Sequence, residues 1–145
     1  MYIMLHPKYI IGLVDGEGSF TVYVRNPNKT VKTERRVRVE PRFYLKLIEK
    51  DKSILYELRQ FFKCGNVYFQ KDNRENHQDC YRFEVANRND IENIIIPFFK
   101  ENPLKLASKI KDFKIFCNLM RRIKKGEHLT QNGLNNLYKI KQLMH

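Results

Sequence analysis

The chain has 145 residues, and its 28 lysines and arginines exceed its 16 aspartates and glutamates, which gives a formal net charge of +12. The length suits a single domain, 1–145, because soluble domains usually run to roughly 100–150 residues. Hydrophobic residues make up 42% of the chain, which is enough for a packed core and argues against disorder. No apolar run reaches the roughly 18 residues of a membrane-spanning helix. We therefore expect one basic domain that does not enter a membrane and binds a polyanion.

The N-terminal segment and the cysteines indicate the compartment. Residues 1–20 are apolar but lack a basic stretch and a small-residue cleavage site, so no secretory signal is predicted. The three cysteines are an odd number, which does not indicate a disulfide framework. We expect an intracellular protein, and the sequence leaves an organelle matrix and a prokaryotic cytoplasm as alternatives.

The first predicted elements are a helix and a basic hairpin. Pro7 suits the first turn of a helix that continues through the apolar residues 9–14. Alternating apolar residues then predict two strands, with Phe20 in the first and Phe43 in the second. Residues 20–48 hold eight basic and two acidic residues, a net +6, so half of the positive excess lies here. This face either binds a ligand or is a solvated surface, and its arginines with interleaved tyrosines favour the ligand.

The rest of the chain predicts a helix, a shorter hairpin and further helices. Asp51 or Ser53 can cap a helix that runs to residue 62 and is ended by residues 64–66. Strands are expected over residues 67–71 and 80–86. Helical patterns follow at 89–99, at 107–123, and after Thr130 with Leu134, Leu137, Tyr138 and Leu143 on the last helix. The order of the elements predicts an α+β fold.

Glycines and acids gather at the end of the first helix. Gly12, Gly16 and Gly18 lie within seven residues that also hold Asp15 and Glu17. Glycine in a helix costs about 1 kcal/mol relative to alanine, so we expect Gly12 to allow another backbone to approach closely. Acids at a helix C-terminus are unfavourable because the dipole there is already negative. We expect the glycines to permit unusual backbone angles and a divalent cation to explain the acids, since carboxylate and carbonyl oxygens suit Mg²⁺. A glycine-rich helix stop with exposed acids is the alternative.

The segment YIIGLVDGEGSF, residues 9–20, resembles the LAGLIDADG motif of homing endonucleases, with Ile10, Ile11 and Gly12 in place of Leu-Ala-Gly. The motif occurs once. The resemblance implies the family's αββαββα fold, with an antiparallel four-stranded saddle sheet and packed helices in each protomer. The similarity extends over most of the chain, with further landmarks at residues 47–51, 62–65, 109–113 and 127–134.

The resemblance also implies a partner, a cofactor and their residues. Members with one motif form homodimers, so two motif helices are expected to pack through Ile11, Gly12 and Val14. The cofactor is Mg²⁺, for which Mn²⁺ or Ca²⁺ can substitute in binding. The implied ligands are the Glu17 carboxylate and the Gly16 carbonyl, and Asp15 is a second candidate ligand that matches an acid more often structural in the family.

Two further catalytic positions carry over from the family. Glu49 matches a polar residue at the end of the second strand that orients solvent, with a solvated strand end as the alternative. Lys109 matches a basic residue that stabilises charge on phosphate, with Lys105 as its rival and an ordinary surface lysine as the alternative. Metal-assisted hydrolysis of a phosphodiester needs no histidine or serine nucleophile.

The outer face of the sheet is expected to read DNA. Arginine can bind guanine O6 and N7 in the major groove, and lysine and tyrosine can reach phosphates and other base edges. By strand parity, the DNA-binding candidates are Ser19, Thr21, Tyr23, Arg25, Arg36, Arg38, Glu40, Arg42, Tyr44, Lys46, Tyr68, Gln70, Arg82 and Glu84.

Together, the residues and the resemblance predict a site-specific, Mg²⁺-dependent double-strand DNA endonuclease, encoded in an intron, that acts as a homodimer on a long pseudo-palindromic site. One alternative is an RNA-binding intron maturase, an activity that can coexist with cleavage. The other is a non-catalytic DNA-binding regulator. Glu17 argues against a pure binder, because a carboxylate beside the scissile phosphates repels DNA unless a metal is present.

Overall fold

The fold is described from a computed structural model of the chain, in residues 4–28, 37–72, 74–75 and 78–145. The chain forms two compact units. The first comprises Met1–Ser19 and Arg42–Leu106, and the second comprises Phe20–Pro41 and Ala107–His145. In the described ranges, no helix combines the length and the apolar character needed to cross a membrane.

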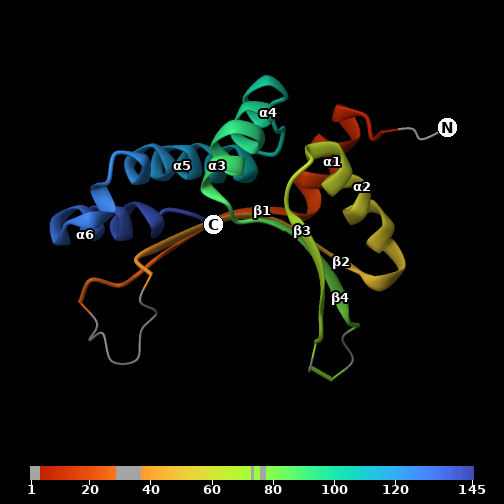
Figure 1. Cartoon of the computed structure of the whole chain (residues 1–145), viewed down its shortest axis with the longest axis horizontal. Helices are drawn as coiled ribbons and strands as arrows, with labels where there is room; N and C mark the ends of the chain where they lie inside the picture. The colour runs from red at the N-terminus through yellow and green to blue at the C-terminus, as the bar shows by residue number, and fades with distance from the viewer. Residues whose placement is uncertain (1–3, 29–36, 73, 76–77) are drawn as a thin grey trace. The chain divides into compact units, whose positions relative to one another are not determined.

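The order of the elements agrees with the expected helix-strand-strand pattern (Figure 1). Within the described part of the chain, four strands form one sheet in the order β1-β2-β4-β3. The β2–β4 and β3–β4 pairs are antiparallel, which confirms the expected α+β fold. The elements are α1 (Pro7–Glu17), β1 (Gly18–Val24), β2 (Val39–Ile48), η2 (Glu49–Asp51), α2 (Lys52–Phe62), β3 (Asn66–Gln70), β4 (Cys80–Val85), α3 (Arg88–Asp90), η3 (Ile91–Ile95), α4 (Ile96–Glu101), α5 (Ala107–Lys124), η4 (Glu127–Leu129) and α6 (Gln131–Lys141).

One predicted helix end is confirmed and two others are shifted. Helix α2 ends at Phe62, as predicted, and Lys63 after it adopts a left-handed conformation at φ 57°. Asn87 begins α3 by accepting a hydrogen bond from the Asp90 N–H at 3.1 Å, two residues before the predicted start. The last helix ends at Lys141, so Leu143, which was predicted on it, lies beyond the helix. The Leu143 residue is 60% exposed. Thr130 caps α6 as predicted and accepts from the Gly133 N–H at 3.0 Å.

An aromatic cluster forms the core of the first unit. The ring of Phe43 on β2 lies 6.3 Å from Phe62, 6.4 Å from Phe83 and 5.5 Å from Phe99, measured between centroids. These partners come from α2, β4 and α4, so the helices cover the face of the sheet on which Phe43 lies. Phe43 pairs with Val85, and Leu45 pairs with Phe83. The predicted alternation along β2 is therefore confirmed from Val39 to Lys46.

The second unit has its own core around Phe20. The Phe20 ring packs on two rings of α5, at 5.1 Å from Phe113 and 5.4 Å from Phe116. Helix α6 runs back along α5 (Figure 1). Phe20 is thus buried against α5, and the other apolar residues of β1 are also buried, as the strand pattern predicts.

The last turn of α1 is anchored through Asp15. Its side chain is only 8% exposed. Its carboxylate accepts hydrogen bonds from the Lys105 N–H at 3.1 Å and from the Leu106 N–H at 3.2 Å, in the segment that follows α4. This anchoring explains one of the two acids at the helix end without a metal.

Position 18 needs a glycine because there is no room for a side chain, and not because of its backbone angles. Its φ of −81° and ψ of 157° are extended values that any residue adopts, so the expected unusual angle is wrong at this position. A Cβ added to Gly18 would lie 2.6 Å from Val14 Cγ1 and 2.9 Å from the Val14 carbonyl oxygen. The absent side chain lets β1 start directly over the last turn of α1.

We predict that Gly18→Ala destabilises the protein by about 1–3 kcal/mol, because the added methyl group overlaps Val14. Urea denaturation measures the change. The control is Gly16→Ala, in the same turn, where an added Cβ meets nothing within 4 Å and alanine favours the helix. Equal stability of the two variants would contradict the steric explanation.

A second prediction concerns the two neighbouring acids. Asp15→Ala should cost about 1–3 kcal/mol of unfolding free energy, because it leaves the Lys105 and Leu106 N–H groups without their acceptor. Glu17→Ala, at an exposed position, should change stability by less than about 0.5 kcal/mol. Thermal and urea unfolding of both variants test this, and a larger loss for Glu17→Ala would refute it.

Candidate functional site

A pocket of about 450 Å³ opens beside the end of α1 in the first unit. Glu17 contributes the motif acid to its wall. The other walls come from the end of β2, from η2 and from the hairpin of β3 and β4. The lining residues are Glu17, Lys46, Leu47, Ile48, Asp51, Asp72, Arg74, Gln78 and Cys80. The fold thus places the motif acid in one pocket with side chains that lie up to 63 residues away in sequence.

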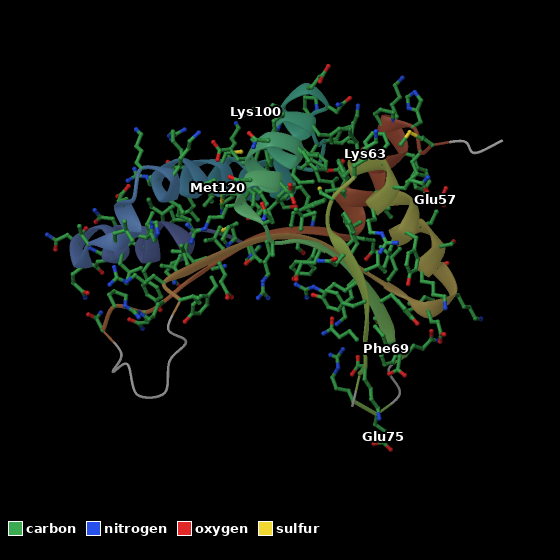
Figure 2. The ribbon with its side chains drawn as sticks, in the orientation of Figure 1. Glu57, Lys63, Phe69, Glu75, Lys100 and Met120 are labelled. Atoms are coloured by element: carbon green, nitrogen blue, oxygen red, sulfur yellow. The ribbon has the colours of Figure 1, made fainter. Side chains whose placement is uncertain are left out.

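The hairpin supplies one acid that already has a counterion. The Arg74 guanidinium binds the Asp72 carboxylate through both oxygens, with Nε at 3.0 Å from Oδ1 and Nη2 at 2.7 Å from Oδ2. This hydrogen bonding raises the pKa of Arg74. Figure 2 shows the hairpin with Phe69 on β3 and Glu75 near its end. For Glu17, in contrast, no hydrogen bond or ion pair of the carboxylate is found among the described residues.

The end of α1 fits a divalent cation. Glu17 and Gly16 are both exposed, and the last carbonyls of a helix have no partner within the helix. Carboxylate and carbonyl oxygens are ligands that Mg²⁺ takes while it keeps several waters. Within the described ranges, no group of three or more His, Cys, Asp or Glu side chains is arranged to hold a metal. By their chemistry, the Glu17 carboxylate and the Gly16 carbonyl are donors that suit Mg²⁺, whose other ligands would be water and phosphate.

The three other catalytic candidates have different surroundings. Glu49 follows β2 directly, as predicted, but its side chain is 64% exposed, forms a 3.8 Å ion pair with Lys52 and does not line the pocket of Glu17. Lys105 lies in the segment after α4 and lines a separate pocket with Lys8 and Ile11. Lys109 is half-buried near the start of α5, in the second unit.

Lys46 is the lysine that the pocket brings to Glu17. Its sequence position indicated only a DNA-binding role on the outer face of β2. The end of β2 forms part of the pocket wall, so Lys46 and the acid line the same pocket. The alternation along the strand predicts which face of the sheet carries Lys46. It does not predict which other elements of the fold line a pocket with this residue.

DNA-binding candidates of the first unit gather on the outer face of its strands. Tyr44 pairs with Glu84, Lys46 pairs with Arg82, and Arg82 also pairs with Tyr68 across the β3–β4 ladder. Directly paired residues share one face of a sheet. Gln70 and Cys80 pair on the same side. The structure therefore unites side chains that the sequence assigned to two separate hairpins.

In the second unit, Thr21 and Arg38 already have partners. Thr21 Oγ1 accepts a hydrogen bond from Lys141 Nζ at 3.1 Å. Burial lowers the pKa of Lys141. Arg38 Nη1 donates to the carbonyl oxygens of Leu129 at 2.6 Å and His128 at 3.4 Å, so this arginine links the residue before β2 to η4. Lys141 carried no sequence signal, because it lies 120 residues from Thr21.

The remaining candidates are placed as follows. Tyr23, Arg25, Glu40 and Arg42 are half-buried, as is Ser19 at the start of β1. Arg36 lies outside the described residues. On α1, Gly12 is exposed with nothing within 4 Å of an added Cβ, whereas Ile11 is 8% exposed and Val14 is completely buried within its own chain.

Comparison with known proteins relates this arrangement to a family. The LAGLIDADG endonuclease family model matches residues 10–120. A Neurospora crassa protein named probable intron-encoded endonuclease 2 is 32% identical over 135 residues, which cover 92% of this chain and 28% of that protein. This chain thus spans little more than a quarter of the length of that curated relative.

Solved structures give the same relationship. The homing endonuclease I-TnaI is 37% identical, with a TM-score of 0.80, and the match covers 99% of this chain and 90% of I-TnaI. I-SmaMI, bound to an uncleaved DNA target in the presence of calcium ions, is 27% identical with a TM-score of 0.80, over 97% of this chain and 45% of its own. The family match includes α1 from Ile10 onward and all of the strands described above. The chain therefore belongs to the LAGLIDADG endonuclease family.

Proposed function

We propose that this chain is a site-specific double-strand DNA endonuclease that requires a divalent cation. The observation that carries the proposal is the exposed Glu17 carboxylate at the end of the motif helix, in one pocket with basic side chains of the sheet and hairpin. The names of the relatives support DNA cleavage and an origin within an intron, and they favour it over the maturase alternative. I-SmaMI, bound to DNA with calcium, supports duplex DNA and a divalent cation as ligands.

Glu17 and the carbonyl of Gly16 would hold the cation. Asp15 would not contribute a ligand in this proposal, because its carboxylate binds two backbone N–H groups instead. We propose Mg²⁺ for catalysis, with Mn²⁺ or Ca²⁺ as substitutes in binding. When bound, such an ion supplies an activated water and stabilises charge on the phosphate and the leaving oxygen.

Residues of the chain would prepare the phosphodiester for attack. Lys46 lines the pocket with Glu17 and offsets part of its repulsion of phosphate, whereas Arg74 in the same wall is already paired with Asp72. Glu49 and Lys109 keep the roles that the family resemblance implies, which are orienting solvent and stabilising charge on the phosphate. The outer faces of the strands would carry the DNA.

We also propose that two copies of the chain form the active enzyme. The motif occurs once in the sequence. Gly12 is exposed on α1 and leaves open space where a side chain would be, which suits the close approach of a second α1. Ile11 lies beside it, whereas Val14 is buried in its own chain. A two-fold enzyme would act on a long pseudo-palindromic site.

The cleavage proposal predicts that Glu17→Gln lowers metal-dependent cleavage by at least about 100-fold, because it removes a ligand charge, while DNA binding stays within a few-fold. A target is first selected from a pool of duplexes with a randomised central segment. Cleavage of that target is then followed with Mg²⁺ and with EDTA. The control is Glu57→Gln on α2 (Figure 2), which makes the same chemical change away from the pocket. Wild-type cleavage by Glu17→Gln would refute the assignment.

The dimer proposal predicts that Gly12→Leu produces a folded monomer. The variant should fold because nothing lies within 4 Å of the added Cβ and leucine favours a helix more than glycine does. Sedimentation velocity at micromolar concentrations measures the assembly, and circular dichroism checks the fold. Gln60→Leu, at an exposed position of α2, is the matched control and should remain dimeric. A dimer of unchanged stability in Gly12→Leu would show that α1 is not the interface.

A further inference from the structure

Glu84 is an acid on a sheet face that the proposed function assigns to DNA. A carboxylate in this place repels phosphates, so its presence needs an explanation. A common role for such an acid is to accept a hydrogen bond from cytosine N4 in the major groove. The side chain of Glu84 is only 14% exposed, which leaves little of it available to a base.

Both carboxylate oxygens of Glu84 already accept hydrogen bonds within the protein. Oε1 accepts from Arg82 Nη2 at 2.8 Å, and Oε2 accepts from the Tyr68 hydroxyl at 2.8 Å. Arg42 Nε lies 3.7 Å from Oε1, which is close enough for an ion pair. These three partners come from β4, β3 and β2, so one carboxylate links neighbouring strands of the first unit.

Arg82 is held from a second side as well. Its guanidinium carbon lies 3.6 Å from the centre of the Tyr44 ring, in a cation–π stack. The Arg82 side chain is 15% exposed, whereas that of Arg42 is 35% exposed. Glu84 and Arg82 are therefore about equally buried, and Arg42 is the more accessible of the two arginines.

We propose that Glu84 is a positioning residue for DNA recognition. Its carboxylate holds the accessible Arg42 by charge and the accessible Tyr68 by a hydrogen bond, so that these two groups meet DNA in one orientation. Its hydrogen bond with the equally buried Arg82 fixes the carboxylate in place. Glu84 itself does not read a base. This inference rests on the proposed function, because it requires that the outer face of these strands binds DNA.

The physical gain is pre-organisation. A free arginine side chain loses rotamer freedom when it binds and can also turn toward a wrong base, whereas a held guanidinium has already lost that freedom. Removing the Glu84 charge should therefore have two opposite effects. The added net positive charge strengthens binding to any duplex, and the released side chains discriminate less between sequences.

The array formed by Glu84 and its partners Arg82, Tyr68 and Arg42 can be detected without DNA through the pKa of Tyr68. Burial raises the pKa of Tyr68, and so do the hydrogen bond to Glu84 and the charge of Glu84, while Arg82 and Arg42 lower it. In Glu84→Gln the charge is removed, so the pKa of Tyr68 should fall. An NMR titration of tyrosine ring carbons measures it, with the Tyr68 signal assigned by Tyr68→Phe. Glu57→Gln is the matched control and should leave the pKa of Tyr68 unchanged, and an unchanged value in Glu84→Gln would overturn the proposal.

The role in recognition is tested with a duplex selected from the randomised pool and with its single-base-pair variants. We expect Glu84→Gln to lower the ratio of affinities for the selected duplex and its single-base-pair variants by about tenfold. The loss should fall at the same base pairs at which Arg42→Ala lowers this ratio. Binding to an unrelated duplex should become about twofold tighter. Urea denaturation and the tyrosine spectra establish that each variant is folded.

Three outcomes would overturn the inference. Unchanged discrimination in Glu84→Gln would show that the array does not act in recognition. A change of preference from cytosine to adenine at a single base pair would show that Glu84 reads a base directly, since glutamine binds adenine. Failure of the wild-type protein to enrich any sequence would refute the proposed function and this role with it, while the titration of Tyr68 would still show whether the array exists.

Discussion

Burial of Phe43 among the rings of the first unit is the constraint on which the outer surface of its strands depends. The ring lies against Phe62, Phe83 and Phe99, and its neighbours along β2 must face the other way because strand side chains alternate. A slip of one residue would turn Lys46 into this core and place Phe43 in solvent. Burying an unpaired charge is far more costly than exposing it, so the aromatic cluster determines which side of the sheet is basic.

Helix geometry separates the two motif acids. Asp15 and Glu17 are two residues apart, which is about 200° of rotation on a helix with 3.6 residues per turn. When one side chain turns inward to bind Lys105 and Leu106, the other is exposed. Gly18 then lets the strand begin over the last helical turn. The position of Glu17 thus follows from contacts made by its neighbours and not from any contact of its own.

The acids of a chain with a net charge of +12 differ in how their charge is compensated. Asp72 is paired with Arg74, and Glu84 is paired with Arg82. These pairs reduce repulsion of a polyanion and fix the direction of the arginines. Glu17 has no such partner among the described residues, and a bound cation supplies the missing charge in the proposed function.

The sequence by itself determined the order of the elements, the inner and outer faces of the strands, the Thr130 cap and the motif with Glu17. These features depend on residues close together in the chain, whose spacing reflects the period of a helix or a strand. It misplaced local ends such as the start of α3, which Asn87 caps, and the end of α6 at Lys141. Only the tertiary structure decided that Asp15 binds residues about 90 positions away, that Lys46 shares a pocket with Glu17, and that Glu84 joins three strands. Such partners are set by the packing of distant elements, which no local periodicity encodes.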